Sequence, residues 1–381
     1  MLKKFSVSNF KGFENKTTID LSDVKNYEFN NEAIEAEEKI VKMALVYGPN
    51  GIGKSNLCLA IFDIVSNLTD NRVSPAYYDS NYTNGNTKTT ELTEFEYLFQ
   101  FKGTSVRYAY GKSSFRKIQH ESLSIGETTV LQYDKRNNKS EVHLEIVGTE
   151  SLNIDLEKIE ISLVKYVRAN SVFSDTADNH ILKQFFSFVE RMFEFWSLDR
   201  KDFQGPEPTT TNGRNIGRDI IGQKKVEEFK QFLGRIGVEN NIVAEKNPDG
   251  EFDLYYKYKH RKIDFLTNCS SGIRALTLFF FWLQRMQDSD HPASLVCIDE
   301  FDAFYNYSIS AEIIRLLMKM NCQVILTTHN TTLMTNDLLR PDCYFVMSMD
   351  TIASLSHLTP KELRQAHNLE KMYKSKMFER P

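Results

Sequence analysis

The sequence of 381 residues predicts an α/β fold with a mixed or parallel core sheet, an antiparallel β subdomain and a helical insertion. Three patterns support this prediction. Apolar runs at 41–47, 294–298 and 323–327 are typical of short strands buried on both faces of a parallel sheet. Residues 94–147 alternate apolar and polar side chains, which favours an antiparallel meander. Residues 182–196 place apolar side chains at three- and four-residue spacing, which predicts a helix.

The composition is that of an ordinary folded protein. Hydrophobic residues make up 41%, charged residues 26%, and the formal net charge is −4, which excludes wholesale disorder and a generally basic nucleic-acid coat. Five scattered cysteines without a C-x-x-C pair predict a reducing, cytoplasmic setting, with no disulfide framework and no zinc site. The longest apolar run, 273–283, is interrupted by Arg274 and is too short to span a bilayer, so we expect no membrane partner.

The N-terminal part should consist mainly of strands joined by loops. Residues 2–21 predict two strands around a turn at 11–13, and residues 56–67 predict a helix with one apolar face. Residues 70–92 are rich in Asn, Thr, Ser and Tyr, which indicates a mobile loop. Residues 161–167 predict one further strand.

The rest of the chain should alternate helices and strands around one linker. Residues 205–222 concentrate Gly, Pro, Thr and Asn, which is typical of a linker. The remaining patterns predict a hairpin strand at 252–258 and helices at 226–236, 272–286 and 309–320. We expect three segments, namely an N-terminal lobe at 1–167, a helical insertion with the linker and the hairpin at 168–265, and a C-terminal lobe at 266–381.

The strongest chemical signal is a glycine-rich loop between the strand at 41–47 and the helix at 56–67. It matches the phosphate-binding pattern GxxxxGK[ST] in the strand–loop–helix context that this motif requires. Glycines let backbone N–H groups approach phosphate oxygens, Lys54 would reach the β- and γ-phosphates, and Ser55 would bind Mg²⁺. A plain glycine-rich turn is the alternative. The nucleotide-binding residues predicted here are Gly48, Pro49, Asn50, Gly51, Gly53, Lys54, Ser55 and Asn56.

Two adjacent carboxylates follow the apolar run at 294–298. Asp299 would lie in the Mg²⁺ shell of the glycine-rich loop, and Glu300 would polarise the attacking water in a hydrolysis reaction. An apolar run followed by an acidic residue is common in proteins. The prediction therefore depends on the presence of the glycine-rich loop in the same chain.

A histidine and a pair of serines complete the candidate set. His329 follows the apolar run at 323–327 and one further threonine, Thr328. It therefore stands at the carboxyl end of a predicted strand, where α/β proteins bind their ligands. We predict that it senses the γ-phosphate, although a purely structural histidine is the alternative. Ser270, Ser271 and Gly272 open the helix at 272–286 and would bind phosphate at its N-terminus, with an ordinary N-cap as the alternative.

These four elements, in this order, resemble the ABC-type ATPases, with residues 269–273 similar to a divergent LSGGQ signature. In that fold two heads sandwich two nucleotides, and the glycine-rich loop of one head faces the signature of the other. The resemblance implies an ABC-type ATPase head with ATP and Mg²⁺ as cofactors and with Glu300, His329 and Lys54 as catalytic residues. It also implies a homodimer or a higher homo-oligomer.

Three further stretches resemble one branch of these ATPases. Residues 5–13 are similar to the start of structural-maintenance, RecF-like and OLD-like ATPases, and residues 299–305 are similar to the DE[IF]DA segment of the OLD-like group. Residues 362–373 resemble the ending of that group's RloA and AbiL-type members. This implies an ATPase that acts as sensor or scaffold in bacterial abortive-infection defence against phage, controlling a separately encoded effector such as a nuclease or toxin.

The sequence also departs from these families. OLD-like nucleases carry a C-terminal TOPRIM domain, and the segment after His329 is too short for one, so we expect no intrinsic nuclease activity. Ser271 and Ile273 replace the usual Gly and Gln of the signature, and Asn306 stands where many members have His. Gln100 is the single candidate for the glutamine of the Q-loop.

Two other functions compete with the defence role. A RecF-like DNA-repair ATPase fits the length, and it would bind DNA with steep salt dependence. Nucleic acid is therefore a partner that the sequence allows, but residues 199–235 mix basic with acidic side chains and no dense basic patch stands out. A transporter subunit fits poorly because the antiparallel block at 94–147 directly follows the glycine-rich loop and its helix.

Overall fold

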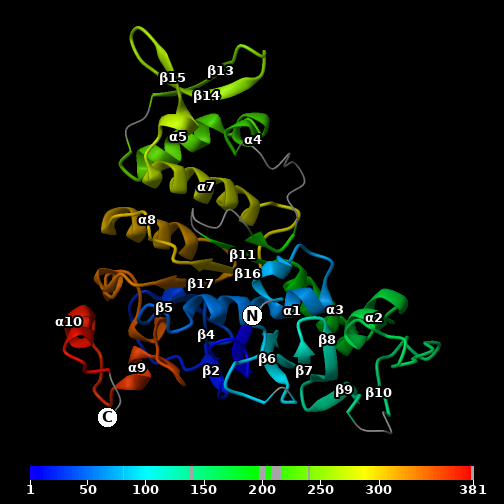
Figure 1. The fold of residues 1–381 in the computed structure, drawn as a ribbon. Helices are drawn as coiled ribbons and strands as arrows, with labels where there is room; N and C mark the ends of the chain where they lie inside the picture. The colour runs from blue at the N-terminus through cyan, green and yellow to red at the C-terminus, as the bar shows by residue number, and fades with distance from the viewer. Residues whose placement is uncertain are drawn as a thin grey trace.

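Two seven-stranded sheets and a projecting insertion make up the structure (Figure 1). One sheet is antiparallel, the other contains the parallel core, and helices lie around and between them, so the predicted α/β class is confirmed. The computed structural model describes residues 1–79, 81–88, 90–136, 141–196, 203–206, 216–238 and 241–378.

The antiparallel sheet has the strand order β10-β9-β8-β7-β6-β1-β2. In β6 the odd-numbered residues from Thr93 to Phe101 are buried and the intervening ones are partly exposed, which is the alternation that the sequence shows. The predicted meander at 94–147 and the two strands at 2–21 are confirmed. The strands are β1 (Leu2–Ser8), β2 (Thr17–Asp20), β6 (Thr93–Phe101), β7 (Thr104–Ser114), β8 (Lys117–Ile125), β9 (Thr128–Asp134) and β10 (His143–Leu144).

The core sheet has the order β12-β11-β16-β17-β5-β18-β19. Its five inner strands are parallel, and the two edge strands β12 and β19 pair antiparallel with their neighbours. The three apolar runs of the sequence are its strands β5, β16 and β17, as predicted. The strands are β5 (Met43–Tyr47), β11 (Met192–Trp196), β12 (Phe203–Gln204), β16 (Leu295–Asp299), β17 (Gln323–Thr328), β18 (Tyr344–Met347) and β19 (Ile352–Ser354).

Helix α1 (Lys54–Leu68) packs against both sheets, and most of its residues are therefore buried. On one side the Tyr97 hydroxyl of β6 donates a hydrogen bond to the Ala60 carbonyl at 2.9 Å. On the other side Cys58 forms a disulfide with Cys297 of β16, with the two Cα atoms 6.3 Å apart. The expectation of no disulfide is wrong here, because the two cysteines are 239 residues apart in sequence and become neighbours through helix–sheet packing.

A buried ion pair joins α1 to the antiparallel sheet. Lys112 of β7 donates to Asp63 at 2.6 Å, and both side chains are fully buried. The hydroxyls of Tyr82 and Tyr110 each donate to the same carboxylate at 2.8 Å. Burial lowers the pKa of Lys112, while the adjacent Asp63 opposes that shift.

The stretch at 161–167, predicted as a strand, is mostly helix α2 (Leu163–Asn170). Ser162 caps this helix, since its hydroxyl accepts a hydrogen bond from the Lys165 N–H at 3.1 Å. The cap and the helical burial of Val164 and Val167 outweigh the β-branched composition of the segment.

The apolar stripe at 182–196 contains two elements instead of one helix. Helix α3 (Ala177–Glu190) ends just before Arg191, and Met192–Trp196 form the parallel strand β11 beside β16. The apolar spacing continues unbroken across Arg191, so the sequence pattern conceals the helix end. Every residue of β11 is buried, because this strand lies inside the core sheet.

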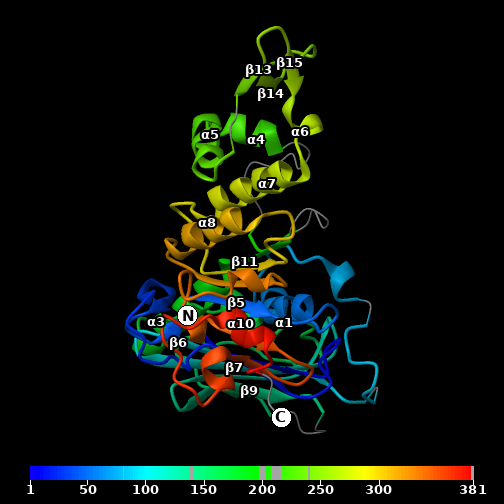
Figure 2. The same ribbon diagram turned by 90° about the vertical axis from the view of Figure 1, so that its left-hand side faces the viewer.

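The insertion lies at the end of the molecule opposite the antiparallel sheet, with α7 and α8 between it and the core sheet (Figures 1 and 2). Its helices pack on α7 through aromatic rings, such as Phe229 and Phe280, whose centroids are 5.1 Å apart. Its elements and the two supporting helices are α4 (Ile216–Gly222), α5 (Val226–Arg235), β13 (Ile242–Lys246), β14 (Phe252–Lys257), β15 (Lys262–Asp264), α6 (Phe265–Asn268), α7 (Ser271–Met286) and α8 (Tyr307–Met318).

These bounds confirm the three helices and the hairpin strand predicted for this part of the chain. Of the predicted linker at 205–222, residues 207–215 lie outside the described residues, and its described end is helix α4. The division into three segments stays a prediction, to which the structure adds that β11, within 168–265, belongs to the core sheet.

The segment at 70–92, expected to be a mobile loop, is anchored in its described part. Tyr78 and Tyr82 are buried, and the Tyr78 hydroxyl lies 3.0 Å from the Leu59 carbonyl oxygen of α1. The composition alone did not indicate this anchoring, because it depends on which positions the two buried tyrosines occupy. Short elements complete the described chain, namely β3 (Ile34–Glu35), β4 (Ile40–Val41), α9 (Leu355–Leu358) and α10 (Leu369–Lys374). Among the described residues, no helix has the length and apolar character needed to cross a membrane.

Replacing Lys112 by Met should lower the free energy of unfolding by about 3 kcal/mol, because the Asp63 carboxylate would remain buried without its cationic partner. Urea titration followed by circular dichroism measures this change. Lys117→Met removes an exposed lysine of the same sheet and should change stability by less than about 0.5 kcal/mol. Equal stability of the two variants would contradict the importance of the ion pair.

Candidate functional site

Three neighbouring parallel strands end at one edge of the core sheet. β17 lies between β16 and β5, so the residues that follow these three strands are brought together. The glycine-rich loop follows β5, Glu300 follows β16, and His329 follows β17. Ligands of open α/β sheets bind at such carboxyl ends.

The glycine-rich loop requires glycine at defined positions. Gly51 and Gly53 have φ values of +78° and +107°, which favour glycine. A Cβ atom at Gly48 would lie 2.9 Å from the Ile52 side chain and 3.0 Å from the Met347 carbonyl oxygen. No side chain caps α1 at Gly53, so the backbone N–H groups of its first turn can bind a negatively charged group.

Lys54, the first residue of α1, is buried beneath this loop. Its ammonium group donates to the carbonyl oxygens of Gly48 at 2.9 Å and Pro49 at 3.1 Å. Burial lowers the pKa of Lys54, and the nearby Asp299 and Glu300 carboxylates oppose that shift. The cation is therefore held at the position where phosphate oxygens would meet the loop.

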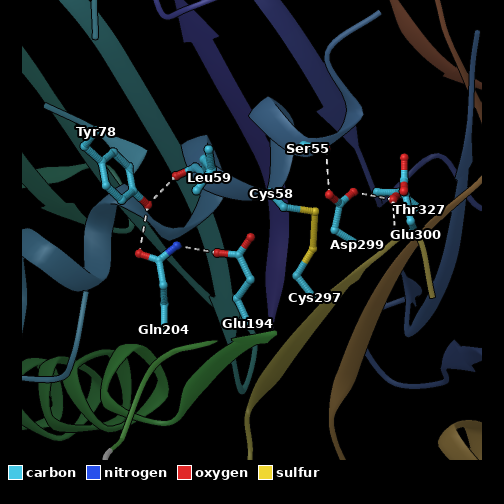
Figure 3. Close-up of a disulfide and its surroundings, with 10 residues drawn as sticks. All are labelled: Ser55, Cys58, Leu59, Tyr78, Glu194, Gln204, Cys297, Asp299, Glu300 and Thr327. Carbon is cyan, nitrogen blue, oxygen red and sulfur yellow. Dashed lines mark hydrogen bonds between the residues drawn. A yellow bond between two sulfur atoms is a disulfide. The ribbon is translucent and has the colours of Figure 1, made fainter. Parts of the chain in front are cut away.

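Asp299 is the centre of a hydrogen-bond network (Figure 3). The Ser55 hydroxyl donates to Oδ2 at 2.6 Å, and the Thr327 hydroxyl donates to Oδ1 at 2.6 Å. The Glu300 N–H donates to the Thr327 oxygen at 2.8 Å. The network joins the first turn of α1 to the ends of β16 and β17, and it fixes both oxygens of the carboxylate.

Glu300 turns out of the strand that carries Asp299. Its φ of +48° is uncommon for a residue other than glycine, and the hydrogen bond of its N–H to Thr327 supports this conformation. The carboxylate is half exposed, and its Oε1 lies 3.5 Å from His329 Nε2. Glu300 is therefore oriented by the backbone and remains open to water.

His329 lies between a basic group, the Lys54 ammonium, and an acidic group, the Glu300 carboxylate. Its Nδ1 is 3.2 Å from the Lys54 ammonium, which can only donate, and its Nε2 faces Glu300. A hydrogen bond between Lys54 and His329 therefore requires Nδ1 to be the acceptor. The imidazole thus connects the glycine-rich loop after β5 with the acidic residue after β16.

The donor set fits Mg²⁺. Ser55 Oγ and the Asp299 carboxylate are hard oxygen donors within 2.6 Å of each other, and Mg²⁺ binds through one or two such protein ligands together with water and phosphate. The other predicted residues of the glycine-rich loop precede or follow this serine in sequence. Pro49, Asn50 and Gly51 are exposed at the tip of the loop, and Asn56 is partly exposed in the first turn of α1.

The signature candidates lie apart from this cluster. Ser270 caps α7, since its hydroxyl accepts from the Ile273 N–H at 3.3 Å, and Ser271 is exposed. A Cβ atom at Gly272 would lie 3.1 Å from the Phe304 carbonyl oxygen. Within the described residues, no hydrogen bond or ion pair connects these three residues to the glycine-rich loop. Among the residues described, the two predicted phosphate sites of one chain are therefore not joined by a direct bond.

Gln100 and Asn306, two further residues that were compared with family positions, lie in β6 and at the start of α8. Gln100 lies in β6 of the antiparallel sheet, where its N–H donates to the Met1 carbonyl, so it does not belong to the core-sheet edge. Its position within a strand does not support the assignment to the Q-loop. Asn306 caps α8 by accepting from the Ile309 N–H at 3.0 Å.

The sequence reading missed Thr327. Its hydroxyl is fully buried and touches both Asp299 and Glu300, yet a threonine in an apolar strand is an ordinary residue there. The available signal was its place two residues before His329 at a strand end. Asp302 was missed as well, and burial raises the pKa of this carboxyl while hydrogen bonds from Thr328 and Asn330 oppose the shift.

Residues 43–335 match the family model described as "AAA domain, putative AbiEii toxin, Type IV TA system". The match covers most of the chain and includes the glycine-rich loop, both carboxylates and His329. The chain belongs to this AAA family. The family indicates an ATPase of the ABC/AAA type, and it implies the use of ATP, typically with Mg²⁺.

Among solved structures, the SMC head domain from Thermotoga maritima matches with 16% identity and a TM-score of 0.45, covering 95% of this chain and 99% of that one. An SmcHead bound to the C-winged helix domain of ScpA matches with 15% identity and a TM-score of 0.46, covering 93% and 97%. These TM-scores lie below 0.5, so nothing further is concluded from them. No curated protein matches the sequence.

Thr327→Val should lower the free energy of unfolding by about 2 kcal/mol, because Asp299 Oδ1 and the Glu300 N–H would lose their partner in a buried position. Thr327→Ser keeps the hydroxyl and serves as the matched control. Urea unfolding followed by circular dichroism compares the two. If the valine variant is as stable as the serine variant, the hydroxyl does not hold this network.

Proposed function

We propose that this protein binds ATP with Mg²⁺ and hydrolyses it to ADP and phosphate at the carboxyl edge of its core sheet. The observation that carries the proposal is the convergence of Lys54, Ser55, Asp299, Glu300 and His329 at the ends of β5, β16 and β17. Phosphoryl transfer to water requires a lysine that binds the phosphates, a hydroxyl and a carboxylate that hold Mg²⁺, and a group that orients the attacking water.

The glycine-rich loop would hold the phosphates. The uncapped N–H groups at the start of α1 would bind their oxygens, and Lys54 would exchange its carbonyl partners for the β- and γ-phosphates. This exchange favours binding because a desolvated ammonium gains anionic partners in place of neutral ones. Gly48 to Gly53 and Asn56 would enclose the same groups.

Ser55 and Asp299 would hold Mg²⁺, which neutralises charge on the phosphates when it is bound. Thr327 would act as a positioning residue, since its hydroxyl orients the Asp299 carboxylate and supports the Glu300 backbone. The metal ligands are thus fixed before the nucleotide arrives, which lowers the cost of reorganisation during the reaction.

Glu300 would polarise the attacking water and accept its proton. The left-handed backbone turns its carboxylate away from the Mg²⁺ ligands, and the half-exposed position admits water. His329 would donate a hydrogen bond from Nε2 to the γ-phosphate, in exchange for its present contact with Glu300. Binding of the γ-phosphate would then change the contacts of His329 with both Lys54 and Glu300.

Hydrolysis would require two heads. Ser270, Ser271 and Gly272 stand at the N-terminus of the 16-residue helix α7, where the helix dipole favours an anion. They are not connected to the glycine-rich loop of their own chain, which supports a homodimer or higher homo-oligomer in which they meet the γ-phosphate bound by a partner head.

Two variants should separate binding from hydrolysis. Lys54→Ala should weaken ATP binding by at least about tenfold, since it removes charged hydrogen bonds to the phosphates. Glu300→Gln should retain binding but lower kcat by at least about 100-fold, since it removes the general base. Calorimetric titration with ATP and a phosphate-release assay measure the two quantities.

Glu127→Gln, an exposed carboxylate in the turn between β8 and β9, is the matched control and should hydrolyse ATP at the wild-type rate. Mass photometry should show that ATP converts the Glu300→Gln protein into a dimer or larger assembly. Wild-type hydrolysis by Glu300→Gln would refute the assignment of the base, and a strictly monomeric protein would refute the two-headed site.

We further propose that this ATPase acts as the sensor or scaffold of a bacterial abortive-infection defence against phage, controlling a separately encoded effector. Two observations support this role. Residues 362–373 resemble the ending of RloA and AbiL-type ATPases, and the matching family description names a toxin of a Type IV TA system. The buried Leu363 and Leu369 show that this tail packs as part of the folded chain.

A tagged chain should retain the product of the neighbouring gene during purification, and it should retain more of it as Glu300→Gln with ATP than as Lys54→Ala. The reason is that the effector would recognise the assembly that ATP stabilises. Co-expression followed by affinity purification and mass spectrometry measures the retained amount. Absence of the neighbouring product from both preparations would contradict the effector role without affecting the ATPase assignment.

A further inference from the structure

The insertion ends in the three-stranded sheet β13-β14-β15, which lies farthest from the antiparallel sheet (Figures 1 and 2). Strands β14 and β15 are joined by a turn at 258–261. We call residues 257–262 the basic turn. Four of these six residues are Lys or Arg and none is acidic, so positive charge is concentrated at one end of the small sheet.

The cations at the centre of the basic turn are available to a ligand. Lys259 and Arg261 are exposed, and within the described part of the chain neither forms an ion pair. The adjacent acids are engaged instead. Glu245 lies between Lys257 and Lys262 at 3.8 and 3.1 Å, and Asp253 pairs with Arg218 of α4 at 2.7 Å.

Aromatic rings accompany these charges. The Tyr258 side chain is 55% exposed at the start of the turn. Its ring lies 6.5 Å from that of Tyr256, which in turn packs 5.0 Å from the buried ring of Phe265. On the other face of β14, the Lys262 ammonium lies 4.4 Å over the Tyr255 ring. The Tyr258 ring is thus exposed, while the neighbouring Tyr256 ring packs against the buried Phe265.

We propose that the basic turn binds a single-stranded nucleic acid, with Lys259 and Arg261 contacting phosphates and Tyr258 stacking on a base. Closely spaced cations track a phosphate backbone, and an exposed aromatic ring at the same place offers stacking to an unpaired base of any sequence. An acidic protein surface would account for the cations but gives no role to the exposed ring. The basic turn lies outside residues 199–235, which mix basic with acidic side chains.

The site does not depend on the proposed function. It lies on the insertion, apart from the core-sheet edge, so the nucleic acid would bind without ATP. Failure of the binding test would leave the ATPase assignment intact, and failure of the ATPase assignment would leave this site intact.

Fluorescence anisotropy with a labelled 20-nucleotide oligothymidylate, without ATP, tests the proposal. The double variant Lys259→Glu with Arg261→Glu should abolish binding at moderate salt, and the wild-type affinity should fall with rising salt. Tyr258→Ala should weaken binding by at least about fivefold, whereas Tyr258→Phe, which keeps the ring, should match the wild type. A duplex of the same length should bind more weakly than the single strand.

Arg116→Glu with Lys117→Glu is the matched control, since it makes the same change of charge at two exposed residues where β7 connects to β8 in the antiparallel sheet. It should bind the oligonucleotide as the wild type does. The proposal is overturned if the wild type does not bind at low salt, if both double variants lose binding equally, or if Tyr258→Ala binds as tightly as Tyr258→Phe.

Discussion

The Asp299 carboxylate, fixed by two hydroxyl groups, is the interaction on which the site depends. Ser55 donates from the first turn of α1 and Thr327 donates from β17, so three elements meet at one side chain. The parallel register of β5, β17 and β16 places their ends within reach of this carboxylate. Because Thr327 also binds the Glu300 N–H, the proposed Mg²⁺ ligands and the proposed base are held by the same network. Movement of any one strand end would therefore disturb all of them.

Helix α1 transmits this arrangement to the rest of the fold. Its first turn carries Lys54 and Ser55, its middle is linked to β16 through Cys58, and further along it Asp63 pairs with the buried Lys112 of the antiparallel sheet. A helix surrounded by sheet on two sides cannot rotate without breaking these contacts. The antiparallel sheet therefore acts as a rigid support for the proposed nucleotide site, and its hydrogen-bonded tyrosines contribute to this rigidity.

The local parts of the site could be predicted from sequence, because a glycine-rich loop and strand-end acids have short, specific patterns. The long-range parts could not. Thr327 resembles any strand residue until the sheet brings it to Asp299, and Cys58 meets Cys297 across 239 residues. Sequence periodicity did not separate α3 from β11, because Met192–Trp196 is buried on both faces and continues the apolar spacing of the helix. Fold class follows from such patterns, whereas helix ends and pairings follow from packing.

A short segment, which is hydrogen-bonded along its length, connects the basic turn to the signature candidates through β15 and α6. β15 ends at Asp264, whose carboxylate caps α6 by accepting from the Thr267 N–H at 2.7 Å. The Cys269 N–H then bonds the Phe265 carbonyl at 2.9 Å, and Ser270 begins α7 directly afterwards. A ligand on the basic turn would thus act on an element that is continuous with the phosphate site that we propose for a partner head. A nucleic acid that prefers one position of this insertion would bias head pairing, since coupling requires only that both events favour the same arrangement.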